Sequence, residues 1–251
     1  MRRALVALIL GAAAASIPGA AAGRGIGLSA SPLRMTLRSA SAAAITVRNP
    51  GRRPLLVDVS RAGFGRSLHG RPEIRAARGR SGWLRLRPKR LRLRAGAKAV
   101  LHVRSAPPRG TAAGDHPALV LLTTRPLGEK HVRVRLRVGV IVDLRVRGQI
   151  VRRLDAGGLT VRRQGARRLL ELRLVNRGNV TEELGSNGIR LALLRNGRRF
   201  VMLKPRREEL LPHSSGIAMF SYGGPVRGAV VARVELRPPL HGPRRAFHLR
   251  L

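Results

Sequence analysis

The chain has no cysteine and few aromatic residues, and each shortage excludes a class of function. Without cysteine there is no disulfide, no thiol nucleophile and no zinc site built on thiolates. Only six of the 251 residues are aromatic. Recognition of single-stranded nucleic acid depends on aromatic side chains that stack on bases. We therefore expect no specific nucleic-acid partner.

Acidic residues are also scarce, at 12 against 51 basic residues, and the formal net charge is +39. Only four of the basic residues are lysine, and the others are arginine. One interpretation is a surface that binds polyanions, because arginine pairs with phosphate and carboxylate groups through two hydrogen bonds. The other is codon bias, since arginine, alanine, glycine, proline and leucine all have GC-rich codons. Both interpretations predict a strongly cationic surface.

Long hydrophobic runs are missing everywhere except at the N-terminus. Arg2 and Arg3 precede an apolar run at residues 4–15, and small residues follow at 20–22. This layout is typical of a secretory signal peptide, which we place at residues 1–22. The run is shorter than the roughly 20 residues that a helix needs to span a bilayer. An uncleaved anchor and a twin-arginine signal are the alternatives. No further transmembrane segment is expected after cleavage.

What the sequence does contain is a strong period of two. Val132–Val138 alternates apolar residues with arginine, and Leu84–Arg87 and Leu91–Arg94 do the same. Such alternation predicts strands with one buried and one solvated face. Residues 204–211 are the only segment outside the signal peptide for which we expect a helical turn. The predicted strands are residues 33–37, 42–48, 54–60, 83–86, 90–94, 98–104, 117–124, 131–142, 148–154, 158–163, 168–175, 188–195, 199–203, 216–222, 228–236 and 245–251.

Sixteen short strands are too many for one β-sandwich, so we predict an all-β chain of two tandem sandwiches. The boundary is expected where an apolar run ends at Asp143, which gives domains at 23–143 and 144–251. A weak repeat supports two copies, because Ile45–Gly51 and Leu172–Gly178 both end an apolar strand in Asn-x-Gly. Asn196-Gly197 in the second half predicts a two-residue hairpin.

Nine short segments of the first half occur in an order that resembles a known module. They are Ala30–Met35, Val47–Gly51, Pro54–Val59, Ser81–Leu84, Pro88, Leu91–Gly96, Pro107, Gly114–His116 and Leu119–Thr124. Over residues 28–142 this order resembles the extracellular immunoglobulin-like modules of the WxL-interacting cell-surface proteins. It is more distantly similar to the N-terminal domain of periplasmic pilus chaperones. The resemblance implies immunoglobulin-like sandwiches. The chaperone likeness also implies an Arg/Lys pair for a subunit's C-terminal carboxylate, which the many arginines leave unassigned.

No motif for catalysis, cofactor binding or metal binding stands out. The seven histidines lack metal-ligand spacing, and Asp115-His116 is either half of a ligand set or a turn. We interpret the acidic pairs Glu182-Glu183 and Glu208-Glu209 as salt-bridged surface groups. The glycosylation-like triplet Asn179–Thr181 is interpreted as turn residues. We therefore predict a protein that is not an enzyme and that has no cofactor and no metal.

The main functional prediction is a secreted or cell-surface binding protein that contacts an anionic envelope polymer or another surface protein. Arg133, Arg135 and Arg137, on one face of a predicted strand, form the candidate cationic patch. The alternative is an extracytoplasmic assembly chaperone, in the periplasm or at the cell surface, that binds a client strand by β-augmentation. A hydrolase with an unrecognised site is the third hypothesis.

Overall fold

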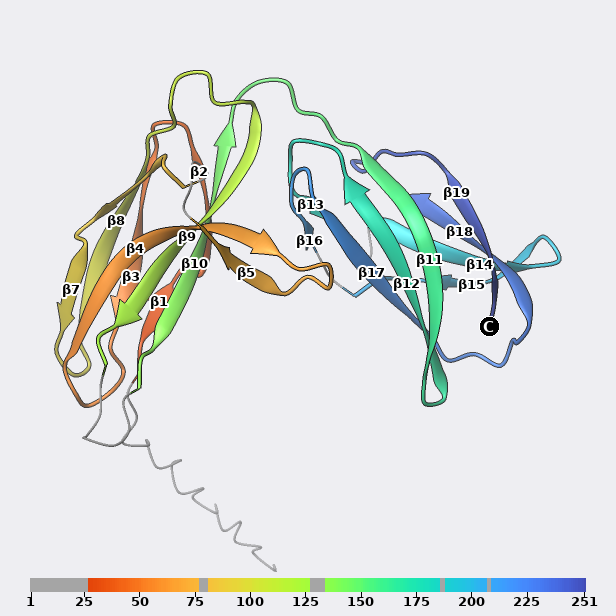
Figure 1. Ribbon diagram of the computed structural model, residues 1–251, viewed down its shortest axis with the longest axis horizontal. Coiled ribbons are helices and arrows are strands. Elements are labelled where there is room, and N and C mark those ends of the chain that lie inside the picture. Colours follow the sequence, from red (N-terminus) through yellow and green to blue (C-terminus); the bar gives the residue numbers. More distant parts are fainter. Residues whose placement is uncertain (1–26, 77–80, 127–133, 186–187, 207–208) are drawn as a thin grey trace, which may run out of the picture.

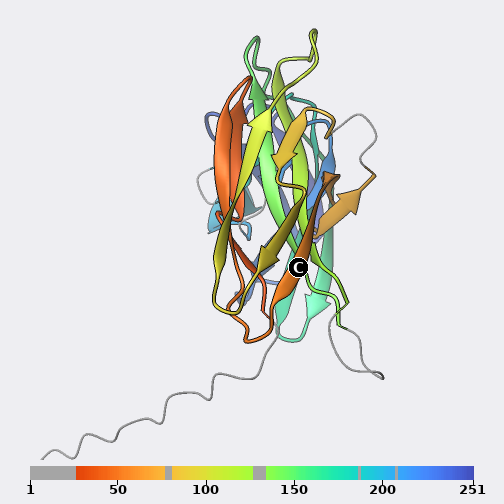
Figure 2. The same ribbon diagram turned by 90° about the vertical axis from the view of Figure 1, so that its left-hand side faces the viewer.

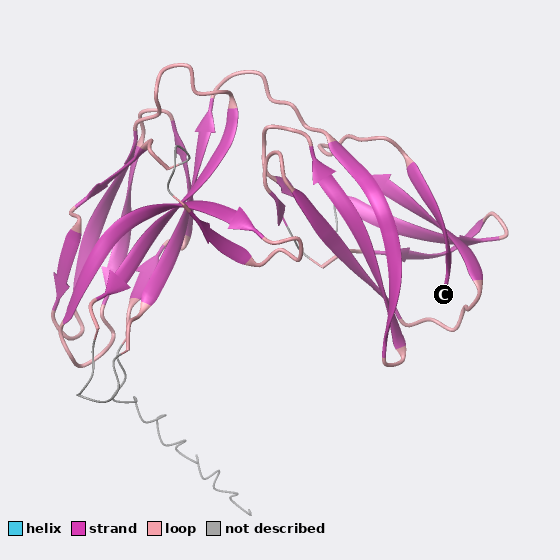
Figure 3. Ribbon diagram, viewed as in Figure 1, coloured by secondary structure: helices cyan, strands magenta, loops and turns pink. Residues whose placement is uncertain are grey.

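The computed structural model describes residues 27–251 except 77–80, 127–133, 186–187 and 207–208. The signal peptide predicted at residues 1–22 lies outside the described residues. The described part of the chain consists of strands, turns and loops without a helix (Figure 3). Accordingly, no helix in it has the length and hydropathy needed to cross a membrane.

The first half of the chain forms a sandwich of two sheets (Figures 1 and 2). One sheet has the strand order β1-β3-β8-β6, and the other has the order β2-β10-β9-β4-β5, with β7 beside β4. Its strands are β1 Ser29–Ser31, β2 Arg34–Arg38, β3 Ala42–Arg48, β4 Leu55–Arg66, β5 Pro72–Arg75, β6 Leu84–Arg87, β7 Arg90–Leu93, β8 Lys98–Ser105, β9 Gly114–Thr124 and β10 Arg137–Val146.

The second half forms another sandwich. One layer is the sheet β11-β12-β17 with the short pair β13-β16 nearby, and the other is the sheet β15-β14-β18-β19. Its strands are β11 Leu154–Gln164, β12 Arg167–Asn176, β13 Glu182–Glu183, β14 Ile189–Arg195, β15 Arg198–Leu203, β16 Glu209–Leu210, β17 Ser215–Tyr222, β18 Ala229–Leu236 and β19 Arg245–Arg250. The structure thus confirms an all-β fold of two tandem immunoglobulin-like sandwiches.

The period of two explains how each core forms. Along β8, Leu101 and Val103 are fully buried while His102 and Arg104 are exposed, because successive side chains of a strand point to opposite faces. The first core gathers such residues around Trp83, and the second gathers them around Phe220. Arginine therefore occupies the solvated face of strands whose other face is closely packed.

The weak sequence repeat corresponds to the same structural device in both halves. Asn49 donates from Nδ2 to the carbonyls of three residues at 2.8–3.2 Å, and its Oδ1 accepts from the Gly51 amide at 3.0 Å. Asn176 donates to three carbonyls at 2.8–3.2 Å, and its Oδ1 accepts from the Gly178 amide at 2.9 Å. Both side chains are completely buried. Each Asn-x-Gly turn is therefore pinned to a neighbouring segment of its own sandwich.

Other local predictions had mixed outcomes. Asn196 and Gly197 both have positive φ and join β14 to β15, which confirms the predicted hairpin. The helical turn expected at residues 204–211 is wrong, since Glu209–Leu210 pairs as a strand with β13. The strand expected at 148–154 is also wrong, because the chain has no ladder partner between Val146 and Leu154.

The division of the chain at residues 143 and 144 stays a prediction. Strand β10 ends at Val146 in the first sandwich, and β11 begins at Leu154 in the second. We propose that residues 147–153 are the connection between the two sandwiches.

Candidate functional site

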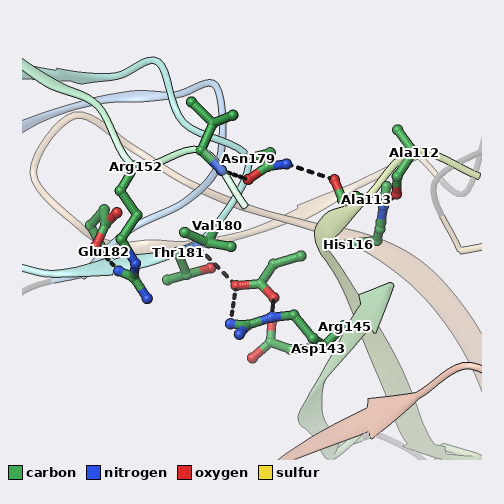
Figure 4. Close-up of polar contacts among 12 residues, drawn as sticks. Ala112, Ala113, His116, Asp143, Arg145, Arg152, Asn179, Val180, Thr181 and Glu182 are labelled. Atoms are coloured by element: carbon green, nitrogen blue, oxygen red, sulfur yellow. Dashed lines mark hydrogen bonds and ion pairs between the residues drawn. The ribbon is translucent and has the colours of Figure 1, made fainter. Parts of the chain in front are cut away.

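The two sandwiches meet closely where β9 begins. The amide of Asp115 donates to the Asn179 carbonyl at 2.8 Å. Nδ2 of Asn179 donates to the Ala113 carbonyl at 3.0 Å (Figure 4). Between these bonds lies Gly114 with a φ of 117°, where an added Cβ would overlap the Asn179 carbonyl oxygen. Only glycine allows the two backbones to approach this closely. We call residues 113–115 and 179–181 the junction.

Asp115 organises the junction electrostatically. Its carboxylate pairs with the guanidinium of Arg145, with an Nη2–Oδ2 distance of 2.8 Å, and Oδ2 also accepts from the Thr181 amide at 2.9 Å (Figure 4). His116 bonds only locally, from Nε2 to the Ala112 carbonyl at 2.8 Å. Both residues therefore lie in β9, and Asp115 alone of the two joins the halves, so neither interpretation made from the sequence describes the pair.

A cavity of about 710 Å³ lies beside the junction. On its wall, Arg34 of β2 pairs with Asp143 of β10, with Nη2–Oδ2 at 2.7 Å, and with Glu209 of the second sandwich. Arg66, at the end of β4, donates from Nε to Glu209 Oε1 at 2.8 Å. One glutamate of the second sandwich thus pairs with two arginines of the first, and Arg34 also pairs with Asp143.

Burial shifts the acidity of two groups here. Desolvation raises the pKa of Asp143, against the opposing effect of Arg34. Desolvation also raises the pKa of Glu182, which is 1% exposed and accepts from Arg152 at 2.5 Å. One carboxylate oxygen of each, Oδ1 and Oε1, is buried and has no hydrogen-bond partner among the described residues. The ionised form of each group is therefore less stable than that of an ordinary surface carboxyl group.

The scarce acidic residues concentrate at this place. Five of the twelve in the sequence lie on the cavity or on the short strands that border it, namely Asp115, Asp143, Glu182, Glu183 and Glu209. The interpretation of the acidic pairs as surface groups is wrong for Glu182, which is buried. Glu208 lies outside the described residues. Arginines that come together where two cationic sandwiches touch would repel one another, and these carboxylates neutralise their charge.

Apolar and backbone contacts complete the interface. Leu211 of the second sandwich packs against Phe64, Leu119 and Leu121 on the outer face of the first. The β4–β5 hairpin reaches across, and its Leu68 carbonyl accepts from the Ile217 amide of β17 at 2.7 Å (Figure 1). The relative position of the two sandwiches is therefore set by several kinds of contact.

A second feature lies on β10. Antiparallel pairing with β9 covers the whole strand from Arg137 to Val146, but parallel pairing with β2 covers only Ile141–Arg145. No described strand pairs with the other side of Arg137–Val140. We call these four residues the open edge. Exposed apolar side chains flank it, with Leu33 at 60% and Val134 at 39% exposure.

The candidate cationic patch falls at the open edge. Arg133 lies outside the described residues, whereas Arg135 and Arg137 are described and exposed. No ion pair is formed by either of these two within the described part of the chain. The patch as a binding site stays a prediction.

The sequence did not indicate how the two sandwiches contact each other. Glu209 stood out only as part of an acidic pair and Arg34 only within a segment of the family resemblance, and the local sequence of Arg145 does not distinguish it from other arginines. Asn179 and Thr181 were noticed only as a glycosylation-like triplet. The one usable signal was Gly114-Asp115, which the family resemblance had already singled out.

No protein-family model matches the sequence, and no curated protein matches it. Many solved structures match the chain, and two of them cover nearly all of it with TM-scores just above 0.5. One comes from a chaperone–tip adhesin complex of CFA/I fimbriae, with a TM-score of 0.51 and 11% identity, covering 89% of this chain and 98% of that one. The other is the class 5 fimbriae chaperone CfaA, with a TM-score of 0.52, 11% identity and the same coverages. These figures show a shared fold.

These neighbours correct the main functional prediction. The expectation of a surface protein that holds an anionic envelope polymer is contradicted, because the structures that match both sandwiches are of fimbrial chaperones. They favour the alternative hypothesis. The prediction that the chain is not an enzyme agrees with them as well. In fold, this chain is similar to chaperones of fimbriae, in agreement with the more distant resemblance noted for its first half.

Proposed function

We propose that the chain is an extracytoplasmic chaperone that binds an extended segment of a client protein along the open edge of β10. The observation that carries this proposal is the mismatch between the two neighbours of β10. Strand β9 pairs with the whole of β10, whereas pairing with β2 begins only at Ile141. Another strand could therefore pair with Arg137–Val140 on the side that faces away from β9.

The backbone geometry supports binding of a strand there. Leu136 directs its carbonyl to the amide of Thr124 on β9 at 2.9 Å, and Ile141 directs its amide to the Leu33 carbonyl before β2 at 2.9 Å. Backbone groups alternate between the two sides of a strand. The amide and carbonyl groups of Arg137 and Gly139 therefore point away from β9, towards the position that a client strand would occupy.

The junction supports the same function by holding the second sandwich in place beside the first. Arg34 and Arg66, which line the cavity, differ from the carboxylate-binding Arg/Lys pair that the chaperone resemblance implies, because their partners are carboxylates of this chain. Arg34 and Arg66 both bind Glu209, and Arg34 also binds Asp143. Binding of the client through backbone pairing therefore has better support than binding of a client carboxylate in the cavity.

The location is part of the proposal. The sequence predicts a signal peptide at residues 1–22, and one structure that shares the fold comes from a complex of a chaperone with a tip adhesin of fimbriae. The resemblance of residues 28–142 to the modules of WxL-interacting proteins stays a prediction. The client we propose is an exported protein with an incomplete sheet.

The test uses proline to block the open edge. Gly139→Pro removes an amide that faces the client position and leaves the pairing with β9 intact. Binding of a labelled nine-residue peptide of alternating valine and threonine should weaken about tenfold or more, because a backbone hydrogen bond is lost and the ring obstructs the strand. Hydrogen exchange should show the Arg137 amide protected by the peptide in the unaltered chain.

The matched control is His248→Pro, at an exposed position of edge strand β19 in the second sandwich. The amide of His248 faces away from β18, since Leu251 and Gly228 exchange the ladder bonds. This variant should bind the peptide normally. Equal loss in both variants, or protection of β19 and not β10, would contradict the proposal.

A further inference from the structure

We propose that the open edge selects client segments that carry acidic side chains at alternate positions, and that Arg135 and Arg137 recognise those side chains. This inference rests on the proposed function and specifies the chemistry of the client.

The direction of the side chains on β10 places Arg137 beside the client. Val138 and Val140 point towards the first core, so Arg137 and Gly139 point to the opposite, solvated face. Side chains of neighbouring strands that share a face lie roughly 5 Å apart at opposed positions. A client residue opposite Arg137 would therefore sit within reach of its guanidinium.

The charge pattern along β10 indicates what that residue should be. Arg145, at the other end of the strand, is neutralised by Asp115, and the neighbouring Arg34 is neutralised by Asp143 and Glu209. Arg137 faces the neutral Thr123 on β9 and forms no ion pair in the described residues. Where these arginines meet another element of the fold, that element supplies a carboxylate. At the open edge the missing carboxylates would come from the client.

The same charges argue against a second copy of this chain as the occupant. Pairing β10 with β10 would bring Arg135 and Arg137 of one copy against those of the other. Like charges at opposed positions of adjacent strands are destabilising. The same two arginines would then attract an acidic client and repel a second copy of the chain. Specific binding commonly combines attraction to one partner with repulsion of another.

The test compares two labelled nine-residue peptides, one of alternating valine and glutamate and one of alternating valine and glutamine. The glutamate peptide should bind the unaltered chain more tightly. In Arg135→Ser/Arg137→Ser its affinity should fall roughly fivefold, since two exposed ion pairs of modest strength are lost, while the glutamine peptide is unaffected. Added salt should reduce the preference.

Arg104→Ser provides the matched control, because Arg104 is an exposed arginine on β8 of the same sandwich. It should retain the full preference for glutamate. The double reversal Arg135→Glu/Arg137→Glu should instead prefer a peptide of alternating valine and lysine.

The outcomes separate the two proposals. Equal binding of the glutamate and glutamine peptides, with no change in the serine variant, would overturn the charge selection and leave strand binding intact. Failure of every peptide to bind, together with an inert Gly139→Pro, would overturn the proposed function itself. Sedimentation showing a dimer that Arg135→Ser/Arg137→Ser strengthens would support the repulsion argument, and a dimer that the same change dissociates would contradict it.

Discussion

Asn49 in the first sandwich and Asn176 in the second have almost the same surroundings. Each is completely buried, donates to three carbonyls and accepts from the amide two residues later. The two sandwiches differ instead at their edges. In the second, the ladders of edge strands β11 and β15 have register irregularities, at Ala156/Leu159 of β11 and at Leu193/Leu194 of the neighbouring β14, whereas those of edge strands β17 and β19 are regular. The open edge of β10 in the first is regular.

This difference separates what holds a sandwich together from what lets it bind. Bulges at edges discourage pairing with other chains, whereas a regular edge permits it. The shared asparagine device explains why both halves keep one architecture despite having little sequence in common. We assign client binding to the first half because β10 is regular and one side of its Arg137–Val140 segment has no partner strand in the described residues.

The largest expected effect tests whether the two asparagines are equivalent. Asn49→Ala and Asn176→Ala should each destabilise their own sandwich by about 4 kcal/mol, because several buried backbone groups lose their partner. Urea unfolding followed separately in each half measures this, with Trp83 reporting on the first sandwich and Tyr222 on the second. The exposed change Arg104→Ser should have almost no effect. A large effect at one asparagine only would show that Asn49 and Asn176 contribute unequally to stability despite their similar surroundings.

A smaller effect is expected where the halves meet. Gly114→Ala adds a Cβ against the Asn179 carbonyl at a positive φ, which should weaken the contact between the sandwiches by about 2–3 kcal/mol. Two separate unfolding transitions should then replace coupled unfolding in calorimetry. Gly158→Ala is the control, because its added Cβ meets no atom within 4 Å. Coupled unfolding in Gly114→Ala would mean that the other interface contacts are sufficient.

The smallest effect is a dependence on pH. The pKa values of Asp143 and Glu182 are raised above their ordinary 3.8 and 4.5, so the folded chain binds these protons more tightly than the unfolded chain. Their contribution to stability should therefore increase as pH falls from neutral through the raised values, and should level off below the ordinary ones. Asp155 has a lowered pKa through Arg177, and its contribution is lost as pH falls.

The measurement is the slope of unfolding free energy against pH in the unaltered chain and in Asp143→Asn/Glu182→Gln. The double variant should lose the gain in stability at mildly acidic pH. Because the pKa of Asp155 is lowered and not raised, Asp155→Asn should change the slope in the opposite direction. An unchanged slope in the double variant would show that Asp143 and Glu182 do not titrate differently in the folded and unfolded chain.

Much of the architecture could be predicted because strand formation is a local property. The alternation in Leu84–Arg87 and Leu91–Arg94 matched strands whose leucines are buried or partly buried and whose arginines are exposed. Residues 204–211 misled the prediction because two glutamates and two leucines suit a helix locally. There the pairing of Glu209–Leu210 with β13, a tertiary contact, overrode the local preference.

The sequence by itself determined two sandwiches with arginine on their solvated faces, since the direction of side chains in a strand depends only on a period of two. Only the tertiary structure decided which arginines are neutralised. Arg34 meets Asp143 across 109 residues and Glu209 across 175, whereas Arg137 remains without an acidic partner in the described residues. Charges attract through space and not along the chain, so the junction and the open edge emerge only when the sheets have packed.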